Sequence, residues 1–267
     1  MAMTVAALER LVKEHGADPT CFTDGRHNWR RWRRSFAGNC ASPVTLELNA
    51  RPEWRNRKFL VVPKEGMSMT VEIEVPCRKC GPCLRRRAAH WRMRALAEYR
   101  AAEARGARSW FSTLTIRPEV RQHILDQVRS NIGYRRERKS GEPITLDFDA
   151  LSPEEQFREK HRFISKEITR YVKRVRTNAR AELRILCVAE VHEGGGALHG
   201  EPHYHMLWHE TSPECPVRKQ VLVSAWAWGF SQHKLVKDPK QATYLCKYLT
   251  KSNLARVRAS VDYGNTS

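Results

Sequence analysis

The chain has 267 residues, and its 48 lysines and arginines exceed its 29 aspartates and glutamates, which gives a net charge of +19 and a pI of about 10.0. Such an excess is typical of proteins that bind a polyanion, with nucleic acid the first candidate. Hydrophobic residues make up 41% of the chain, enough for a core, which excludes a disordered basic tail. Because no apolar run approaches the about 18 residues of a membrane-spanning helix, we expect a cytoplasmic protein without a membrane partner.

Residues 1–39 form a basic N-terminal segment, which begins with a predicted short helix over residues 1–17. Aromatic and cationic side chains alternate over residues 26–34. Arginines bind phosphates while tryptophans stack on unpaired bases, so Arg30, Arg31 and Arg33 are candidate DNA-binding residues. A solvated basic face with tryptophans anchored in the core is an equally good interpretation.

Residues 40–105 contain a cysteine-rich module followed by a basic helix. Cys77, Cys80 and Cys83 form two successive Cys-x2-Cys steps, and a tetrahedral zinc site needs one more ligand. The candidates for this fourth ligand are Cys21, Cys40 and His90. Eight cysteines in a cytosolic chain favour metal binding or buried thiols over disulfides.

Strands are predicted over residues 59–63 and 69–75, between the candidate cysteines. The helix predicted over residues 84–105 starts with Arg85, Arg86 and Arg87, which we expect to face a phosphate backbone. An ordinary surface helix is compatible with the same pattern.

Residues 106–251 alternate between strands and helices. Strands are predicted at 111–116, 184–191, 202–209 and 230–236, and helices after the capping box at 152–155, at 216–227 and at 239–251. We expect residues 117–152 to be a loop or insertion and residues 252–267 to be a flexible tail. The order β-α-β-β-α-β-α indicates an α+β sheet domain.

A His-x-His pair lies in the strand predicted over residues 202–209. Side chains alternate along a strand, so His203 and His205 project from one face. A glycine-rich turn at 194–196 predicts a hairpin that brings Glu190 beside them, which gives a three-ligand divalent-ion site with open positions. Three other residues are alternatives for the third ligand: Glu201, His192 and His199.

Two tyrosines and a lysine share one face of the last predicted helix. The spacing of Tyr244, Tyr248 and Lys251 places them in one stripe, with Lys247 off it. The alternative is an amphipathic helix whose tyrosines pack on the core.

Four elements in this order resemble the HUH endonuclease superfamily, and most closely the replication initiators of gokushovirus-like microviruses. They are Phe-x-Thr-Leu-Thr at 111–115, the metal motif from Glu190 to His205, Trp-x-x-Gly-Phe over 226–230, and Tyr244-x3-Tyr248-x2-Lys251. The resemblance implies a largely antiparallel five-stranded sheet flanked by helices, with an N-terminal zinc knuckle. It also selects Cys40 as the fourth zinc ligand, because similar initiators carry a cysteine ahead of the knuckle.

The implied activity is a site-specific nickase and ligase that starts rolling-circle replication of a bacteriophage. In the family, the ligands that match Glu190, His203 and His205 hold magnesium or manganese, and two tyrosines alternate as nucleophiles that form a 5′-phosphotyrosine. Lys251 would offset charge beside them. Tyr248-x2-Lys251 also fits the one-tyrosine pattern, which favours Tyr248 as the first nucleophile.

The expected partners are single-stranded and supercoiled origin DNA, in the host cytoplasm. The sequence has no Gly-x4-Gly-Lys-Ser/Thr helicase signature, so unwinding needs a host helicase, and synthesis a host polymerase. Two alternatives are a non-enzymatic zinc protein that binds nucleic acid, and a relaxase or transposase of the same superfamily.

Overall fold

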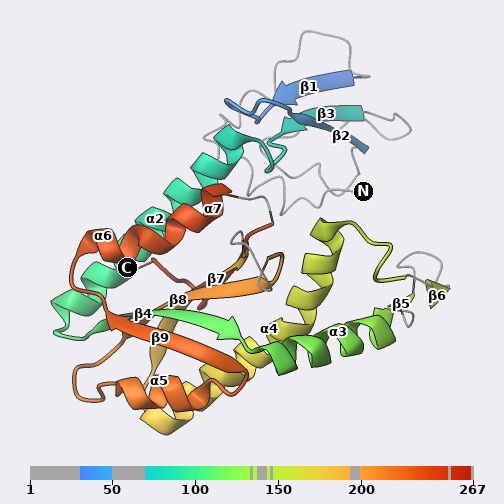
Figure 1. The fold of residues 1–267 in the computed structure, drawn as a ribbon. Coiled ribbons are helices and arrows are strands. Elements are labelled where there is room, and N and C mark those ends of the chain that lie inside the picture. Colours follow the sequence, from blue (N-terminus) through green and yellow to red (C-terminus); the bar gives the residue numbers. More distant parts are fainter. Residues whose placement is uncertain are drawn as a thin grey trace. The chain divides into compact units, whose positions relative to one another are not determined.

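The computed structural model describes residues 31–49, 70–132, 135–136, 143–144, 147–192, 199–251 and 254–265 (Figure 1). Arg30, Cys21, the helix predicted over 1–17 and the strand predicted over 59–63 lie outside these ranges. The chain divides into two compact units, Met1–Leu84 and Arg85–Ser267. No helix within the described ranges has the length and apolar character needed to cross a membrane.

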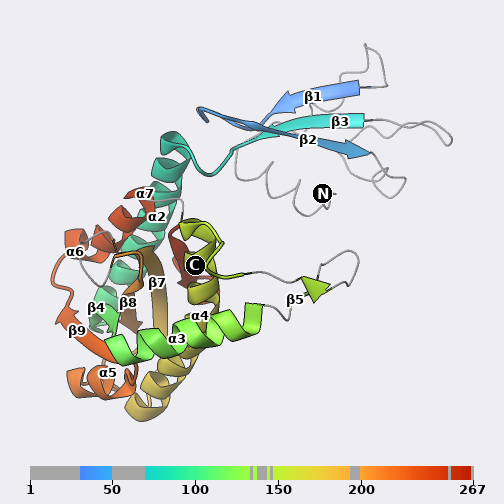
Figure 2. The ribbon, with the colours of Figure 1, turned by 45° about the vertical axis from the view of Figure 1, so that its right-hand side comes forward.

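The first unit contains a three-stranded sheet with the order β1-β3-β2 (Figure 2). Its strands are β1 (Arg31–Ser35), β2 (Val44–Asn49) and β3 (Thr70–Val75). Strand β3 confirms the strand predicted over residues 69–75, and it pairs in parallel with β1 and antiparallel with β2. Phe36 and Ile73 are buried in this unit.

The second unit contains a five-stranded sheet with the order β10-β7-β8-β4-β9. Its strands are β4 (Ser109–Ile116), β7 (Leu183–Val191), β8 (Pro202–Glu210), β9 (Gly229–Leu235) and β10 (Arg256–Ala259). Every neighbouring pair is antiparallel. The predicted α+β class, with a five-stranded antiparallel sheet flanked by helices, is therefore confirmed.

Helices cover both faces of this sheet (Figure 1). The core on one face is built with α3 (Pro118–Ile132), α4 (Pro153–Ala179) and α5 (Lys219–Ala225). On the other face the core includes α2 (Gly81–Ala104), α6 (Pro239–Tyr244), η4 (Leu245–Lys247) and α7 (Tyr248–Lys251). Along β8, Tyr204 and Met206 point to the first core and Leu207 to the second, so alternation places His203 and His205 on the second face.

Helix α4 begins as the sequence predicts. Ser152 caps it, because its hydroxyl accepts a hydrogen bond from the backbone N–H of Glu155, whose carboxylate accepts one from the backbone N–H of Ser152. The apolar face of the helix is buried as predicted, with Phe157, Ile164, Ile168, Tyr171, Val172 and Val175 in the core.

The segment 117–152, which the sequence indicated as a loop or insertion, begins with the 15-residue helix α3. Among the described side chains of α3, only Ile124 and Val128 are fully buried, too few for the polar sequence to reveal the helix. The helix predicted over 239–251 is also interrupted, by the 3-10 turn η4 between α6 and α7.

Residues 254–265 do not form the flexible tail that the sequence predicted for residues 252–267. Residues 256–259 form β10, which pairs with β7 and covers its edge. Tyr263 is fully buried, and its hydroxyl lies 2.8 Å from His209 Nε2. The backbone N–H of Gly264 donates to the buried carboxylate of Glu98 at 2.7 Å. These long-range contacts order a segment whose composition is polar.

Candidate active site and metal centre

The predicted metal triad lies on one face of the β7–β8 hairpin. Glu190 is in register with His203, and the ring centroids of His203 and His205 are 4.8 Å apart. His205 Nε2 lies 2.9 Å from Glu190 Oε1, and both side chains are buried. The structure therefore brings together the three residues that the sequence selected.

Two threonines of β4 each contact the Nδ1 atom of one imidazole of the pair. Thr113 Oγ1 lies 3.2 Å from His205 Nδ1, and Thr115 Oγ1 lies 3.4 Å from His203 Nδ1. Histidines that bind a metal through Nε2 commonly donate their Nδ1–H to such an oxygen, which fixes the ring and its tautomer. The sequence analysis missed this role, although the alternation of Thr113 and Thr115 beside the His-x-His strand was its signal.

The donor set fits a divalent ion in part. Two ligand atoms bound side by side at about 2.1 Å from an octahedral ion are roughly 3 Å apart, which is close to the 2.9 Å between His205 Nε2 and Glu190 Oε1. Burial lowers the pKa of His203 to about 4, which keeps its ring in the neutral form that binds metals. Among the described residues, however, only the four cysteines of the first unit gather their ligand atoms within 4.8 Å. Glu190, His203 and His205 must therefore draw closer to hold one ion.

The structure also bears on the alternative third ligands. The carboxylate of Glu201 is engaged by Lys160 Nζ on α4, at 2.5 Å. His199 lies exposed in the turn before β8. The ring of His192 lies 5.5 Å from that of His203, and its buried Nδ1 has no hydrogen-bond partner among the described residues. His192 is thus the alternative that the geometry favours over Glu201.

Both tyrosines lie beside the histidine pair. The ring of Tyr248 stacks on that of His205, with centroids 3.9 Å apart and an interplanar angle of 4°. Tyr244 stands edge-on to Tyr248 at 5.9 Å and is 49% exposed, whereas Tyr248 is 9% exposed. One phenol is therefore packed against the site, and the other faces solvent.

Lys247 lies closer to the tyrosines than its position off the predicted stripe indicated. Its Nζ donates a hydrogen bond to the Tyr244 hydroxyl and lies 3.6 Å and 5.0 Å from the ring centroids of Tyr244 and Tyr248. The cause is the 3-10 turn η4, because residues three apart align in a 3-10 helix. Lys251 Nζ lies 5.4 Å from the centroid of Tyr248, on its predicted side.

The two phenols differ in acidity. Hydrogen bonds from Lys247 and Tyr248 lower the pKa of Tyr244, and the charges of Lys247 and Lys251 act in the same direction. Burial, followed by the hydrogen bond with Tyr244, raises the pKa of Tyr248. Since a phenolate is the better nucleophile, these pKa shifts make Tyr244 the stronger candidate nucleophile, whereas the sequence favoured Tyr248.

A groove of about 790 Å³ opens beside the tyrosines. It is lined from β4, β9, the connection after β9, and α6–α7, by Phe111, Thr113, Gln232, Lys234, Leu235, Lys237, Asp238, Lys240, Gln241, Tyr244 and Tyr248. Three lysines against one aspartate make its lining cationic. The groove therefore reaches both Tyr244 and Tyr248.

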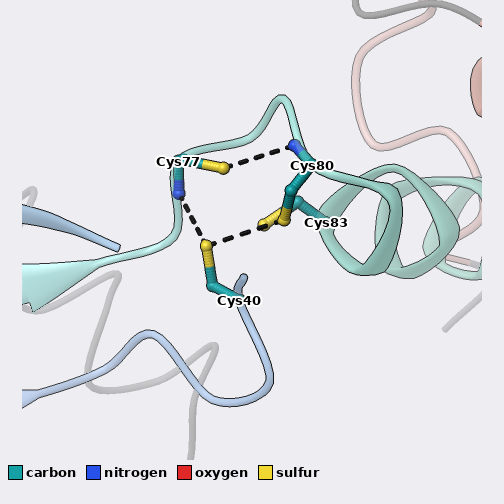
Figure 3. Close-up of side chains that lie close together, drawn as sticks. All are labelled: Cys40, Cys77, Cys80 and Cys83. Carbon is teal, nitrogen blue, oxygen red and sulfur yellow. Dashed lines mark hydrogen bonds between the residues drawn. The ribbon is translucent and has the colours of Figure 1, made fainter. Parts of the chain in front are cut away.

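The four predicted zinc ligands gather in the first unit (Figure 3). Cys40 precedes β2, and Cys77, Cys80 and Cys83 surround the start of α2. The sulfur atoms of Cys40 and Cys80 are 3.7 Å apart, close to the roughly 3.8 Å between two sulfurs in a tetrahedron with Zn–S bonds of about 2.3 Å. The cluster can therefore hold a metal such as zinc. Of its rivals for the fourth place, His90 is exposed on α2 with its ring against Trp91.

Backbone N–H groups support thiolates at this centre. Donation from Ala41 N–H lowers the pKa of Cys80 to about 6, and donation from Lys79 N–H lowers that of Cys77. Burial, together with its neighbouring thiols, raises the pKa of Cys83 to about 12. Zinc binds the thiolate form, so the donated hydrogen bonds favour metal binding over free thiols.

The predicted DNA-binding arginines are distributed over two elements. Arg31 and Arg33 lie on β1, outside the part of the structure whose side chains are described, and Arg85 is exposed on α2. Arg87 Nη2 donates to the carbonyl oxygen of Ala255 at 2.9 Å, which gives this arginine a structural contact before β10. Arg86 is half-buried beside it.

Residues 143–253 match the model of a protein family described as replication-associated protein ORF2. The matched region contains α4, the β7–β8 hairpin with the triad, and both tyrosines. The match supports a replication-initiator family and a role in replication initiation. No curated protein and no solved structure matches the chain significantly.

Proposed function

We propose that the chain is a rolling-circle replication initiator of the HUH superfamily, of the microvirus type, that nicks and rejoins single-stranded DNA at an origin. One observation carries the proposal: Tyr248 stacks on His205 at 3.9 Å with Tyr244 edge-on beside it, so two phenols meet a His-x-His pair and a carboxylate. The replication-associated family match supports the same role.

The proposed chemistry exchanges one phosphodiester for another. Magnesium or manganese, when bound by Glu190, His203 and His205, would supply polarisation of the scissile phosphate. The phenolate of Tyr244, stabilised by Lys247, attacks phosphorus in line. The Tyr Oη–P bond forms, the P–O3′ bond breaks, and the leaving O3′ takes a proton from solvent. The products are a 5′-phosphotyrosine and a free 3′-hydroxyl, and the reverse attack rejoins the strand.

A second tyrosine serves the end of the replication cycle. After one full circle the displaced strand must be cut again while the first tyrosine still carries DNA. Tyr248 would perform this second attack from its place beside His205, with the Lys251 ammonium near its ring to offset charge. The rise in the pKa of Tyr248 comes partly from Tyr244, so a change in the state of Tyr244 would alter it.

The four-cysteine centre has a structural role in this proposal. Zinc bound by Cys40, Cys77, Cys80 and Cys83 would join the loop before β2 to the start of α2. The exposed Arg85 lies on that helix, shortly after Cys83, and would contact DNA phosphates. The partners would be single-stranded and supercoiled origin DNA with a host helicase and polymerase, in the host cytoplasm.

The test is formation of a covalent protein–DNA adduct. The full chain is incubated with Mn²⁺ and a labelled single-stranded pool that contains the origin, and products are separated on a denaturing gel. An adduct that survives Tyr244→Phe and Tyr248→Phe singly, but disappears in the double variant, is the expected result. Wild-type protein that binds the pool without any adduct would refute the proposal.

A second function has one observation in its favour. The cysteine centre is the one described cluster whose ligand atoms already lie close enough for a metal, as in a non-enzymatic zinc protein that binds nucleic acid. In that case Tyr244 and Tyr248 would be packing residues only, and the double phenylalanine variant would bind DNA as wild type does.

A further inference from the structure

Phe230 is an apolar side chain without an evident packing role. It is 69% exposed, although it lies on β9, whose other face contributes the buried His233. Strand β9 is an edge strand, paired only with β4 in the sheet order. An exposed phenylalanine at a sheet edge costs solubility, so a ligand that covers it would explain its presence.

Phe230 lies in the same transverse row of the sheet as Glu190 and His203, two members of the predicted metal triad. It pairs with Thr115 in the β4–β9 register, Thr115 Oγ1 contacts His203 Nδ1 at 3.4 Å, and His203 pairs with Glu190. Neighbouring strands are about 4.8 Å apart, so two strand spacings, roughly 10 Å, separate Phe230 from His203. An adjacent nucleotide of a strand whose phosphate lies at the triad can reach the phenyl ring.

The backbone beneath Phe230 is held close to β4. A Cβ at Gly229 would lie 2.2 Å from the carbonyl oxygen of Thr115, so only glycine permits this approach. The same carbonyl accepts a hydrogen bond from Trp226 Nε1 at 3.3 Å, and Arg117 N–H donates to the carbonyl of Trp228 at 3.0 Å. These contacts hold the backbone next to Phe230 in place without a bound ligand.

Cations follow Phe230 along β9 toward the tyrosines. Gln232 and Lys234 lie on the same face of the strand as Phe230 and line the groove, which continues to Lys237 and Lys240. The one acidic residue in the lining, Asp238, caps α6 by accepting the backbone N–H of Gln241 at 2.8 Å. The surface therefore offers one aromatic face and then positive charge, which matches an unpaired base followed by phosphates.

We propose that an unpaired base beside the scissile phosphate stacks on Phe230, while Lys234, Lys237 and Lys240 bind neighbouring phosphates of the same strand. This rests on the proposed nickase function, and it specifies how the substrate strand crosses the edge of the sheet. The occupant is single-stranded DNA, because a base inside a duplex is stacked on both faces and offers none to the ring.

The test uses fluorescence anisotropy of the full chain without divalent ion, so that binding is measured apart from cleavage. Two labelled oligonucleotides of equal length are compared: a thymidine strand, and a strand of abasic deoxyribose phosphates. Phe230→Ala should weaken binding of the thymidine strand about 5- to 150-fold, but leave binding of the abasic strand within about twofold. Phe230→Trp should restore the affinity for thymidine.

Two controls separate stacking from other effects. Val261→Ala removes another exposed apolar side chain, 84% exposed after the strand β10 at the opposite edge, and should change neither affinity. Lys237→Gln should weaken both strands alike and reduce the salt dependence of binding. A Phe230→Ala variant that binds both strands as wild type does, or loses both equally, overturns the stacking proposal.

The two proposals fail separately. Adduct formation by the wild type with unchanged thymidine binding by Phe230→Ala would leave the nickase function and remove the role of Phe230. Selective loss of thymidine binding in Phe230→Ala, without an adduct from the wild type, would refute the nickase and leave a single-strand binding surface at Phe230.

Discussion

The two candidate metal centres differ in how the chain builds them. At the cysteine centre, three of four ligands lie within seven residues, Cys77–Cys83, and the sulfurs gather within 4.8 Å. At the His-x-His site the ligands come from two strands, and a groove and an exposed phenol lie beside them. Structural zinc sites are closed, whereas catalytic sites keep open positions. A short loop therefore supplies three ligands of the cysteine centre and the segment before β2 supplies the fourth, whereas the register of two strands brings together the candidate ligands of the His-x-His site.

The largest expected effect is the loss of zinc from the cysteine centre while the His-x-His site stays active. Cys77→Ser should reduce zinc from one ion per chain to an undetectable level, because a structural site contributes about 10–16 kcal/mol of binding and folding free energy. Metal analysis of the purified protein measures this. Cys215→Ser, at an exposed cysteine, is the matched control and should keep the ion. Adduct formation on a short oligonucleotide should persist in both variants, and its loss in Cys77→Ser alone would show that the centres are not independent.

The next effect tests the long-range contacts that hold the C-terminal segment in the core. Tyr263→Ala should lower the free energy of unfolding by roughly 3–5 kcal/mol, since the ring is fully buried and its hydroxyl contacts His209. Thermal unfolding followed by circular dichroism measures the loss. Val261→Ala should stay within about 0.5 kcal/mol of wild type. Equal stability of Tyr263→Ala and wild type would contradict the place of the C-terminal segment in the core.

A smaller effect concerns the threonines behind the imidazoles. Thr113→Val keeps the shape of the side chain but removes the oxygen near His205 Nδ1, so affinity for Mn²⁺ should fall about 10- to 100-fold. Titration of Mn²⁺ in the adduct assay and by calorimetry measures it, while zinc content stays constant. Thr113→Ser should retain most of the affinity. Unchanged Mn²⁺ affinity in Thr113→Val would exclude the orienting role.

The smallest effect is a shift in pH dependence. In a Tyr248→Phe background, Tyr244 would be the nucleophile of the proposed reaction, and Lys247 lowers its pKa. Lys247→Met should raise that pKa, reduce the phenolate fraction at a given pH, and move the rising limb of the rate–pH profile to higher pH. Lys173→Met, exposed on α4, is the control. A profile that stays in place, or moves to lower pH, would contradict the assigned contact.

Much of the open site could be predicted because strands alternate with a period of two. His203, His205 and Glu190 followed from the alternation in β8 and the hairpin before it, and the structure places them on one face. Thr113 and Thr115 obey the same rule, but their role depends on β4 lying next to β8, a pairing of residues about 90 positions apart. The sequence alone shows the alternation and not the chemical contact.

The Lys247–Tyr244 contact and strand β10 could not be predicted from the sequence, whereas most of the cysteine centre could. The approach of Lys247 to Tyr244 depends on the tightened turn η4, which helical spacing of 3.6 residues does not reveal. Strand β10 has only four residues, and it forms because β7, which lies far from it in the sequence, offers an edge that β8 does not cover. Three ligands of the cysteine centre were predictable, because spacing within one loop limits where the sulfurs of Cys77, Cys80 and Cys83 can lie. The fourth, Cys40, followed only from the family resemblance, because it is distant in the sequence.

The central claim is tested most directly by locating the covalent bond. Trypsin cleaves after Lys240, Lys247 and Lys251, so Tyr244 lies in peptide 241–247 and Tyr248 in peptide 248–251. After reaction with single-stranded origin DNA and nuclease digestion, mass spectrometry should find a 5′-linked nucleotide on peptide 241–247 of the wild type, and on 248–251 of Tyr244→Phe. A nucleotide on neither peptide, with DNA cleaved, would contradict the tyrosine mechanism.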